Sequence, residues 1–177
     1  SANRPAERLS THMTAYARQD WADAVGYELK DAMKWSELMD YAKAVKEQDP
    51  GKVGENFYPI VIRSGNIYVV QQNSTYAGIT GSPFYRDESG EYRWGGASED
   101  TLTGLRLYSQ MYREGLLHPE FYTLQDPDDI ATFYTTGTSA VIFRERMASP
   151  MQQMATQMKT NLDVDYDEAV RAVTLLG

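Results

Sequence analysis

The sequence contains no cysteine among its 177 residues. This absence excludes disulfide bonds, catalytic thiols and cysteine-ligated zinc sites. A chain without disulfides is compatible with the cytosol, and equally with a surface protein that is stable without cross-links. The cysteine content therefore leaves the compartment open.

Positive charge and long apolar runs are also scarce. There are 17 Lys and Arg residues against 25 Asp and Glu residues, which gives a net charge of -8. The basic residues form no cluster that could follow a phosphate backbone, so we expect no nucleic acid partner. No apolar run approaches the roughly 20 residues that a membrane-spanning helix requires.

Residues that could carry catalysis or bind a metal are few. The two histidines, His12 and His118, have no partner at a spacing typical of a metal site or a catalytic triad. The acids of "DVDYDEAV" alternate as in a calcium loop, but Glu168 stands at the sixth position, where that loop requires Gly. We therefore expect no metal, no other cofactor and no enzymatic activity.

What the sequence does contain is typical of one folded domain. Its hydrophobic content is 42% and its charged content is 24%, as in ordinary globular proteins. The length falls within the roughly 100–200 residues that are usual for a single domain. We expect one domain over residues 1–177.

Periodic apolar positions and end signals predict helices and strands. Gly115 ends one helical pattern, and Asp126 caps another whose first residue is Pro127. Short apolar runs rich in β-branched residues indicate buried strands. The expected helices lie near 36–48, 98–114, 127–136 and 150–160, and the expected strands near 58–63, 139–143 and 169–175.

Four methionines recur near the last of these helices. Met147, Met151, Met154 and Met158 fall on one helical face. Methionine is common at adaptable binding surfaces, but packing in the core is the interpretation that we favour.

Aromatic residues make up 12% of the sequence. Five of them lie in one region, namely Tyr76, Phe84, Tyr85, Tyr92 and Trp94. A turn at Gly90 predicts a hairpin over residues 83–96 that projects from the domain. Such rings could stack on the faces of a sugar, or they could pair with one another across the hairpin.

Four stretches of the sequence follow one another in an order that is typical of a known family. They are "YARQDWADAVGYE", "KWSELMDYAKAVKEQDP", "LRLYSQMYREGLLHPEF" and "FYTTGTSAVIF". Together they resemble the extracellular solute-binding proteins of carbohydrate ABC transporters, the family that includes maltose-binding protein. In the third stretch, Leu116, Leu117 and Phe121 are expected to fold back as apolar anchors after the helix ends.

The resemblance implies a fold, a function and a location. The fold would be α/β, the helix-rich lobe of a periplasmic-binding-protein-like (class II) two-lobed protein, with a small mixed sheet flanked by helices. The function would be to bind a sugar or oligosaccharide for an ABC importer, with the permease and the missing first lobe of the same protein as partners. The full-length protein would be extracellular, as a membrane-anchored lipoprotein or in the periplasm, and the chain would end near the hinge.

Two positions depart from the family pattern. Maltose-binding protein has a sugar-stacking Trp after the strand that resembles "SAVIF", whereas this sequence has Met147 there, with Arg144 and Arg146 close by. Lys34 stands where the helix of the second stretch usually has a Thr cap. An edge that carries arginine favours an acidic or heavily hydroxylated glycan.

The ligand-binding edge is expected where the strands near 58–63 and 139–143 end. Ligands of open α/β sheets lie beyond the carboxyl ends of the strands, and the resemblance points to the same two places. The predicted ligand-binding residues are Asn66, Tyr68, Arg144 and Arg146, with Tyr76 and Met147 nearby. Alternatively, Arg144 and Arg146 belong to a solvated charge cluster or pair with surface acids.

Two other functions remain open from the sequence. One is a helical glycan-acting enzyme whose carboxylates meet only in the folded chain. The other is an interaction domain that binds no small ligand. The lack of a contiguous nucleophile or metal motif counts against the enzyme.

Overall fold

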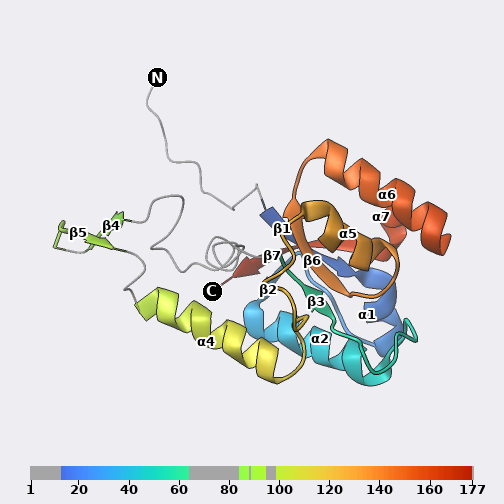
Figure 1. Cartoon of the computed structure of the whole chain (residues 1–177), viewed down its shortest axis with the longest axis horizontal. Coiled ribbons are helices and arrows are strands. Elements are labelled where there is room, and N and C mark those ends of the chain that lie inside the picture. Colours follow the sequence, from blue (N-terminus) through green and yellow to red (C-terminus); the bar gives the residue numbers. More distant parts are fainter. Residues whose placement is uncertain (1–12, 64–83, 88, 95–98, 177) are drawn as a thin grey trace.

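The computed structural model describes residues 13–63, 84–87, 89–94 and 99–176 (Figure 1). Its main sheet has five strands in the order β2-β7-β1-β6-β3. These strands are β1 Met13–Arg18, β2 Ala32–Lys34, β3 Ile60–Val61, β6 Val141–Glu145 and β7 Val170–Leu176. The helices are α1 Gln19–Val25, α2 Trp35–Gln48, α4 Glu99–Arg113, α5 Pro127–Thr135, α6 Ala148–Leu162 and α7 Tyr166–Ala169.

The sheet is mixed because one central strand runs against the others. β1 is antiparallel to both β6 and β7, whereas β2 is parallel to β7 and β3 is parallel to β6. Four strands therefore end at the same edge of the sheet, which we call the carboxyl edge, and they begin at the opposite amino edge. The expectation of a small mixed sheet that includes β3, β6 and β7 is confirmed.

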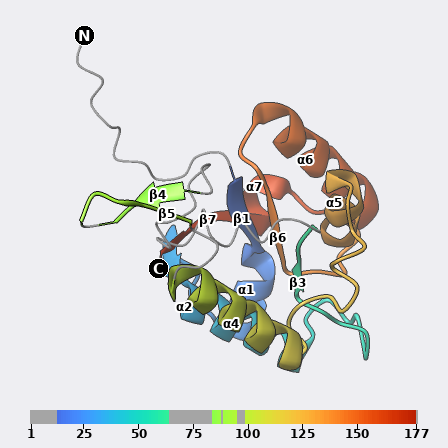
Figure 2. The same ribbon diagram turned by 60° about the vertical axis from the view of Figure 1, so that its left-hand side comes forward.

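Helices cover both faces of this sheet (Figures 1 and 2). Side chains alternate along each strand, so Ala15 and Ala17 of β1 face one core cluster and Tyr16 faces the other. The first cluster contains residues of α1, α2 and α4, and the second contains residues of α5, α6 and α7. Met154 and Met158 are fully buried in the second cluster, which confirms the core interpretation for these two methionines.

The residues that the sequence marks as helix termini are found at helix termini in the structure. Gly115 has φ of 64°, a left-handed conformation that ends α4. Leu116 and Leu117 then fold back and are each only 1% exposed. At α5, the Asp126 carboxylate accepts a hydrogen bond from the backbone N–H of Asp128, and Pro127 is the first helical residue.

The predicted hairpin forms from β4 Phe84–Arg86 and β5 Tyr92–Trp94. Gly90 has φ of 83°, and the backbone register places Phe84 opposite Trp94. In Figure 1 the hairpin lies away from the five-stranded sheet. Tyr92 and Trp94 are 68% and 59% exposed, and the Arg86 guanidinium lies over the Tyr92 ring, 4.7 Å from its centroid.

Candidate functional site

Three of the six predicted site residues are among the described residues, and all three lie at the carboxyl edge. Arg144, Arg146 and Met147 lie at the end of β6, in the strand and in its connection to α6. β3 ends at the same edge because it runs parallel to β6. The other three predicted site residues, Asn66, Tyr68 and Tyr76, lie outside the described residues.

Arg144 is turned into the protein. It shares the strand face of Ile142, toward α5 and α6, and its side chain is 7% exposed. Its guanidinium donates to the carbonyl oxygen of Pro127 at 2.7 Å and to the carboxylate of Asp128 at 2.9 Å, and it makes a longer contact of 3.4 Å with Gln153. Arg144 therefore ties β6 to the start of α5, and its contact with a ligand stays a prediction.

Arg146 and Met147 are exposed, in contrast to Arg144. Met147 is 55% exposed and precedes α6, whose first turn has no acidic residue and no side-chain cap. The first backbone N–H groups of a helix lack partners within the helix and carry partial positive charge. The end of β6 therefore carries an exposed cation and an exposed thioether next to a helix start.

Burial and charge near β6 also affect a buried phenol. Tyr16 of β1 is 1% exposed, and burial raises its pKa above the ordinary value, while the positive charge of Arg146 acts in the opposite direction. The phenol is therefore neutral at physiological pH. Its oxygen has no hydrogen-bond partner among the described residues.

Trp35 also lies at this edge, although nothing in the sequence marked it as a site residue. It follows β2 directly, it is 4% exposed, and its ring stacks on Phe143 of β6 with 5.6 Å between the ring centroids. Its indole nitrogen is buried without a hydrogen-bond partner in the described part of the chain. The helix begins at Trp35 although Lys34 provides no side-chain oxygen as a cap, and Glu37 accepts a hydrogen bond from the backbone N–H of Lys34.

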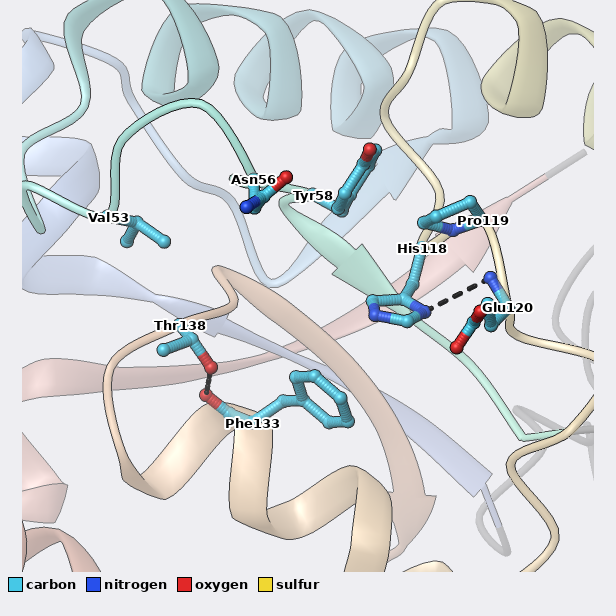
Figure 3. Close-up of a pocket in the computed structure, with 8 residues that line it drawn as sticks. All are labelled: Val53, Asn56, Tyr58, His118, Pro119, Glu120, Phe133 and Thr138. Atoms are coloured by element: carbon cyan, nitrogen blue, oxygen red, sulfur yellow. Dashed lines mark hydrogen bonds between the residues drawn. The ribbon is translucent and has the colours of Figure 1, made fainter.

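A pocket of about 420 Å³ lies at the amino edge of the sheet (Figure 3). Tyr58 precedes β3 and Thr138 precedes β6, so the pocket is on the side of the sheet opposite to Arg146. It is lined by Val53, Asn56, Tyr58, His118, Pro119, Glu120, Phe133 and Thr138. No sequence motif pointed to this pocket, because its walls come from three separate segments of the chain.

His118 forms one wall of this pocket. Its ring contacts Tyr58 and Phe133 edge to face, with 5.6 Å and 5.0 Å between the ring centroids. Its Nδ1 accepts a hydrogen bond from the backbone N–H of Glu120 at 3.3 Å, as Figure 3 shows. Burial lowers the pKa of His118 below its ordinary value, and the nearby charge of Glu120 opposes this effect. The ring is therefore neutral at pH 7, with its proton on Nε2.

Metal and membrane features give no further site. Among the described residues, no group of three His, Cys, Asp or Glu side chains is placed to hold a metal ion. None of the helices within the described ranges is long and apolar enough to cross a membrane.

Comparison with known proteins finds the fold in solved structures. No family model matches the sequence, and no curated protein sequence matches it. An extracellular solute-binding protein from Bifidobacterium longum subsp. infantis is 23% identical over 76% of this chain, with a TM-score of 0.59. The alginate-binding protein AlgQ2 is 17% identical over 92% of the chain, with a TM-score of 0.67. Maltose-bound MalE3 from T. maritima is 15% identical over 92%, with a TM-score of 0.62.

This chain has the fold of one part of an extracellular solute-binding protein. It spans 29%, 32% and 38% of the length of these three proteins, respectively. The periplasmic-binding-protein-like α/β fold expected from the sequence is thus confirmed. At these sequence identities the similarity shows the fold alone. The ligand has to be inferred from the residues of the site.

Proposed function

We propose that this chain is the ligand-binding part of an extracellular protein that binds a sugar or oligosaccharide and delivers it to an ABC importer. The observation that carries the proposal is the fold shared with solved solute-binding proteins, among them a maltose-bound one. Structures with bound D-mannitol and with a fructo-oligosaccharide named fructo-nystose share the fold as well. The chain would act by binding and would have no catalytic role.

The proposed ligand site is the carboxyl edge. Arg146 and Met147 are exposed there, beside the uncapped start of α6. A guanidinium and free backbone N–H groups donate hydrogen bonds to hydroxyl or carboxylate oxygens, and a thioether packs against the apolar face of a sugar ring. Asn66, Tyr68 and Tyr76 complete the set of ligand contacts that we propose, and Arg144 would support the site from inside by tying β6 to α5.

The proposal includes a second lobe that belongs to the same protein. The chain spans about a third of the solved proteins that share its fold, which supports a role as one lobe of a two-lobed clamp. In such clamps the ligand is enclosed when the two lobes close by a hinge motion. We place the full-length protein outside the cell, as a lipoprotein or in the periplasm, where it would meet the permease.

Calorimetry on the full-length protein and on this chain alone tests the proposal. A panel of maltose, fructo-oligosaccharides, mannitol and alginate oligosaccharides should contain a ligand that the full-length protein binds with a micromolar or lower Kd. The isolated chain should bind the same ligand at least 100-fold more weakly, because half of the enclosing contacts are missing. A full-length protein that binds no sugar of a broad panel, or a chain that binds as tightly alone, contradicts the proposal.

A further inference from the structure

The pocket at the amino edge lies on the opposite side of the sheet from the proposed solute site. We propose that it is a second binding site, which takes a single neutral hydroxylated ring such as one sugar residue. The inference does not depend on the proposed function, because none of the pocket residues belongs to the carboxyl edge.

The walls of the pocket are anchored from two sides. His118 donates its backbone N–H to the carbonyl oxygen of Ile60 at 3.0 Å, so it is tied to β3 next to Tyr58. On the other side, Thr138 donates its backbone N–H to the carbonyl oxygen of Phe133 at 2.8 Å. Ligand sites are usually formed before the ligand arrives, and backbone bonds of this kind hold the rings of both walls in place.

Three of the eight residues that line the pocket are aromatic. Figure 3 shows His118 and Phe133 bordering the same space, with Tyr58 across from Phe133. The edge-to-face contacts of His118 with both neighbours fix the tilt of the three rings. Aromatic faces pack well against a ligand that has an apolar face and a polar rim, and the C–H face of a sugar ring has this character.

Polar groups stand around the aromatic surface. With Nδ1 occupied by the N–H of Glu120, the Nε2–H of His118 is the group that can donate to a ligand oxygen. The Thr138 hydroxyl donates to the carbonyl oxygen of Phe133, so its lone pairs can still accept. Asn56 and Glu120 are exposed at the mouth and add an amide and a carboxylate. Donors and acceptors are both present, as hydroxyl groups require.

The charges around the pocket favour a neutral ligand. Lys46 lies 5.5 Å from the centroid of the Tyr58 ring, so a second cation at that ring would be repelled. Glu120 and the net charge of -8 repel anions. The volume of about 420 Å³ is at the lower end of the roughly 300–1,000 Å³ typical of ligand pockets, which is ample for one sugar ring and small for a long oligosaccharide.

The test is an NMR titration of the isotope-labelled chain with three probes. Methyl β-D-glucopyranoside represents the neutral ring, methyl β-D-glucuronide an anionic ring of the same size, and phenol an aromatic ring without the hydroxyl pattern. We expect the glucoside to shift the imidazole resonances of His118 and the amide of Thr138, with a Kd in the millimolar range. The glucuronide should bind at least threefold more weakly.

Substitutions show whether the glucoside binds in this pocket. Asn56→Ala and Glu120→Gln should each weaken glucoside binding at least threefold, while Arg106→Ala on the exposed face of α4 should leave it unchanged. Saturation by phenol with no response to the glucoside would overturn the proposal in favour of an aromatic ligand. No response to any probe, or equal response of Arg106→Ala and Asn56→Ala, would also overturn it. Calorimetry on the full-length protein reports on the carboxyl edge separately, so failure of one site is distinguishable from failure of the other.

Discussion

The two edges of the five-stranded sheet differ in how their side chains are held. At the amino edge, His118 and Thr138 are fixed by backbone hydrogen bonds to β3 and to α5, and together with Phe133 they line a small open pocket. At the carboxyl edge, Arg146 and Met147 extend into open space beside an uncapped helix start. All residues that line the amino-edge pocket belong to this chain, whereas the groups that we propose for the carboxyl edge would need the proposed second lobe to enclose a ligand.

The largest expected effect on stability comes from the residue that holds the segment of His118 against β3. Leu117 is 1% exposed and pairs with Ile60 of β3, next to His118. Leu117→Ala should lower the free energy of unfolding by about 3 kcal/mol, because it leaves a cavity in a packed core. Urea denaturation measures this loss, and the His118 resonances should shift with it.

Leu105→Ala is the matched control for that experiment. Leu105 is 46% exposed on α4, so its truncation should change the unfolding free energy by less than about 0.5 kcal/mol. Equal effects of the two substitutions would mean that the segment after α4 does not anchor the amino edge.

At the carboxyl edge, substitution of Arg144 should reduce the stability of the protein, whereas substitution of Arg146 should leave it nearly unchanged. Arg144→Ala removes hydrogen bonds to Pro127 and Asp128 and should destabilise the protein by about 2 kcal/mol. Arg146→Ala should change stability by less than about 0.5 kcal/mol, because the side chain is exposed. Thermal melts of both variants check this, and a larger loss for Arg146→Ala would reverse the roles that we assign to the two residues.

The smallest expected effect is a pH dependence at the amino edge. Because burial lowers the pKa of His118 below its ordinary value of 6.5, the unfolded chain binds a proton more readily than the folded one. The contribution of His118 is therefore absent well above pH 6.5 and becomes destabilising as the pH falls through 6.5 toward the folded-state pKa. His118→Asn should lose less stability than the unaltered protein between pH 7.5 and pH 5, as urea midpoints would show.

Glu120 offers a check on the sign of this effect. Its charge raises the pKa of His118 against the effect of burial, so Glu120→Gln should lower that pKa further. An NMR titration of the imidazole protons measures the change directly. An upward shift in the variant would show that Glu120 does not act on His118 through its charge.

The sequence predicted those elements that local chemistry determines. The helix ends at Gly115 and Asp126 were recognisable because a left-handed glycine and a carboxylate cap act on their immediate neighbours. β1 was missed, since "MTAYAR" has few β-branched residues and becomes a strand through its pairing with β6 and β7 on both sides. Long-range pairing of this kind leaves little trace in a single segment.

The two candidate sites also depend on contacts between distant segments, which the sequence alone does not show. The alternation of "VIFRE" gives Arg144 the parity of Ile142, but it does not show that Arg144 is buried, because residues on both faces of β6 are buried. The pocket was not available from the sequence, because Asn56, His118 and Thr138 are brought together only by the packing of distant segments. From the sequence, His118 is interpreted as an ordinary turn residue. In the structure its side chain is half-buried and lines the pocket.

The most direct test of the carboxyl edge as the solute site is calorimetry on the full-length protein with Arg146→Ala and Met147→Ala combined. The titrant is the sugar that binds most tightly in the panel, and Arg106→Ala, an exposed arginine on α4, is the matched control. We expect the double variant to bind about 1–3 kcal/mol more weakly with an unchanged melting temperature, and the control to bind normally. Unchanged affinity in the double variant would contradict the assignment of the solute site to this edge.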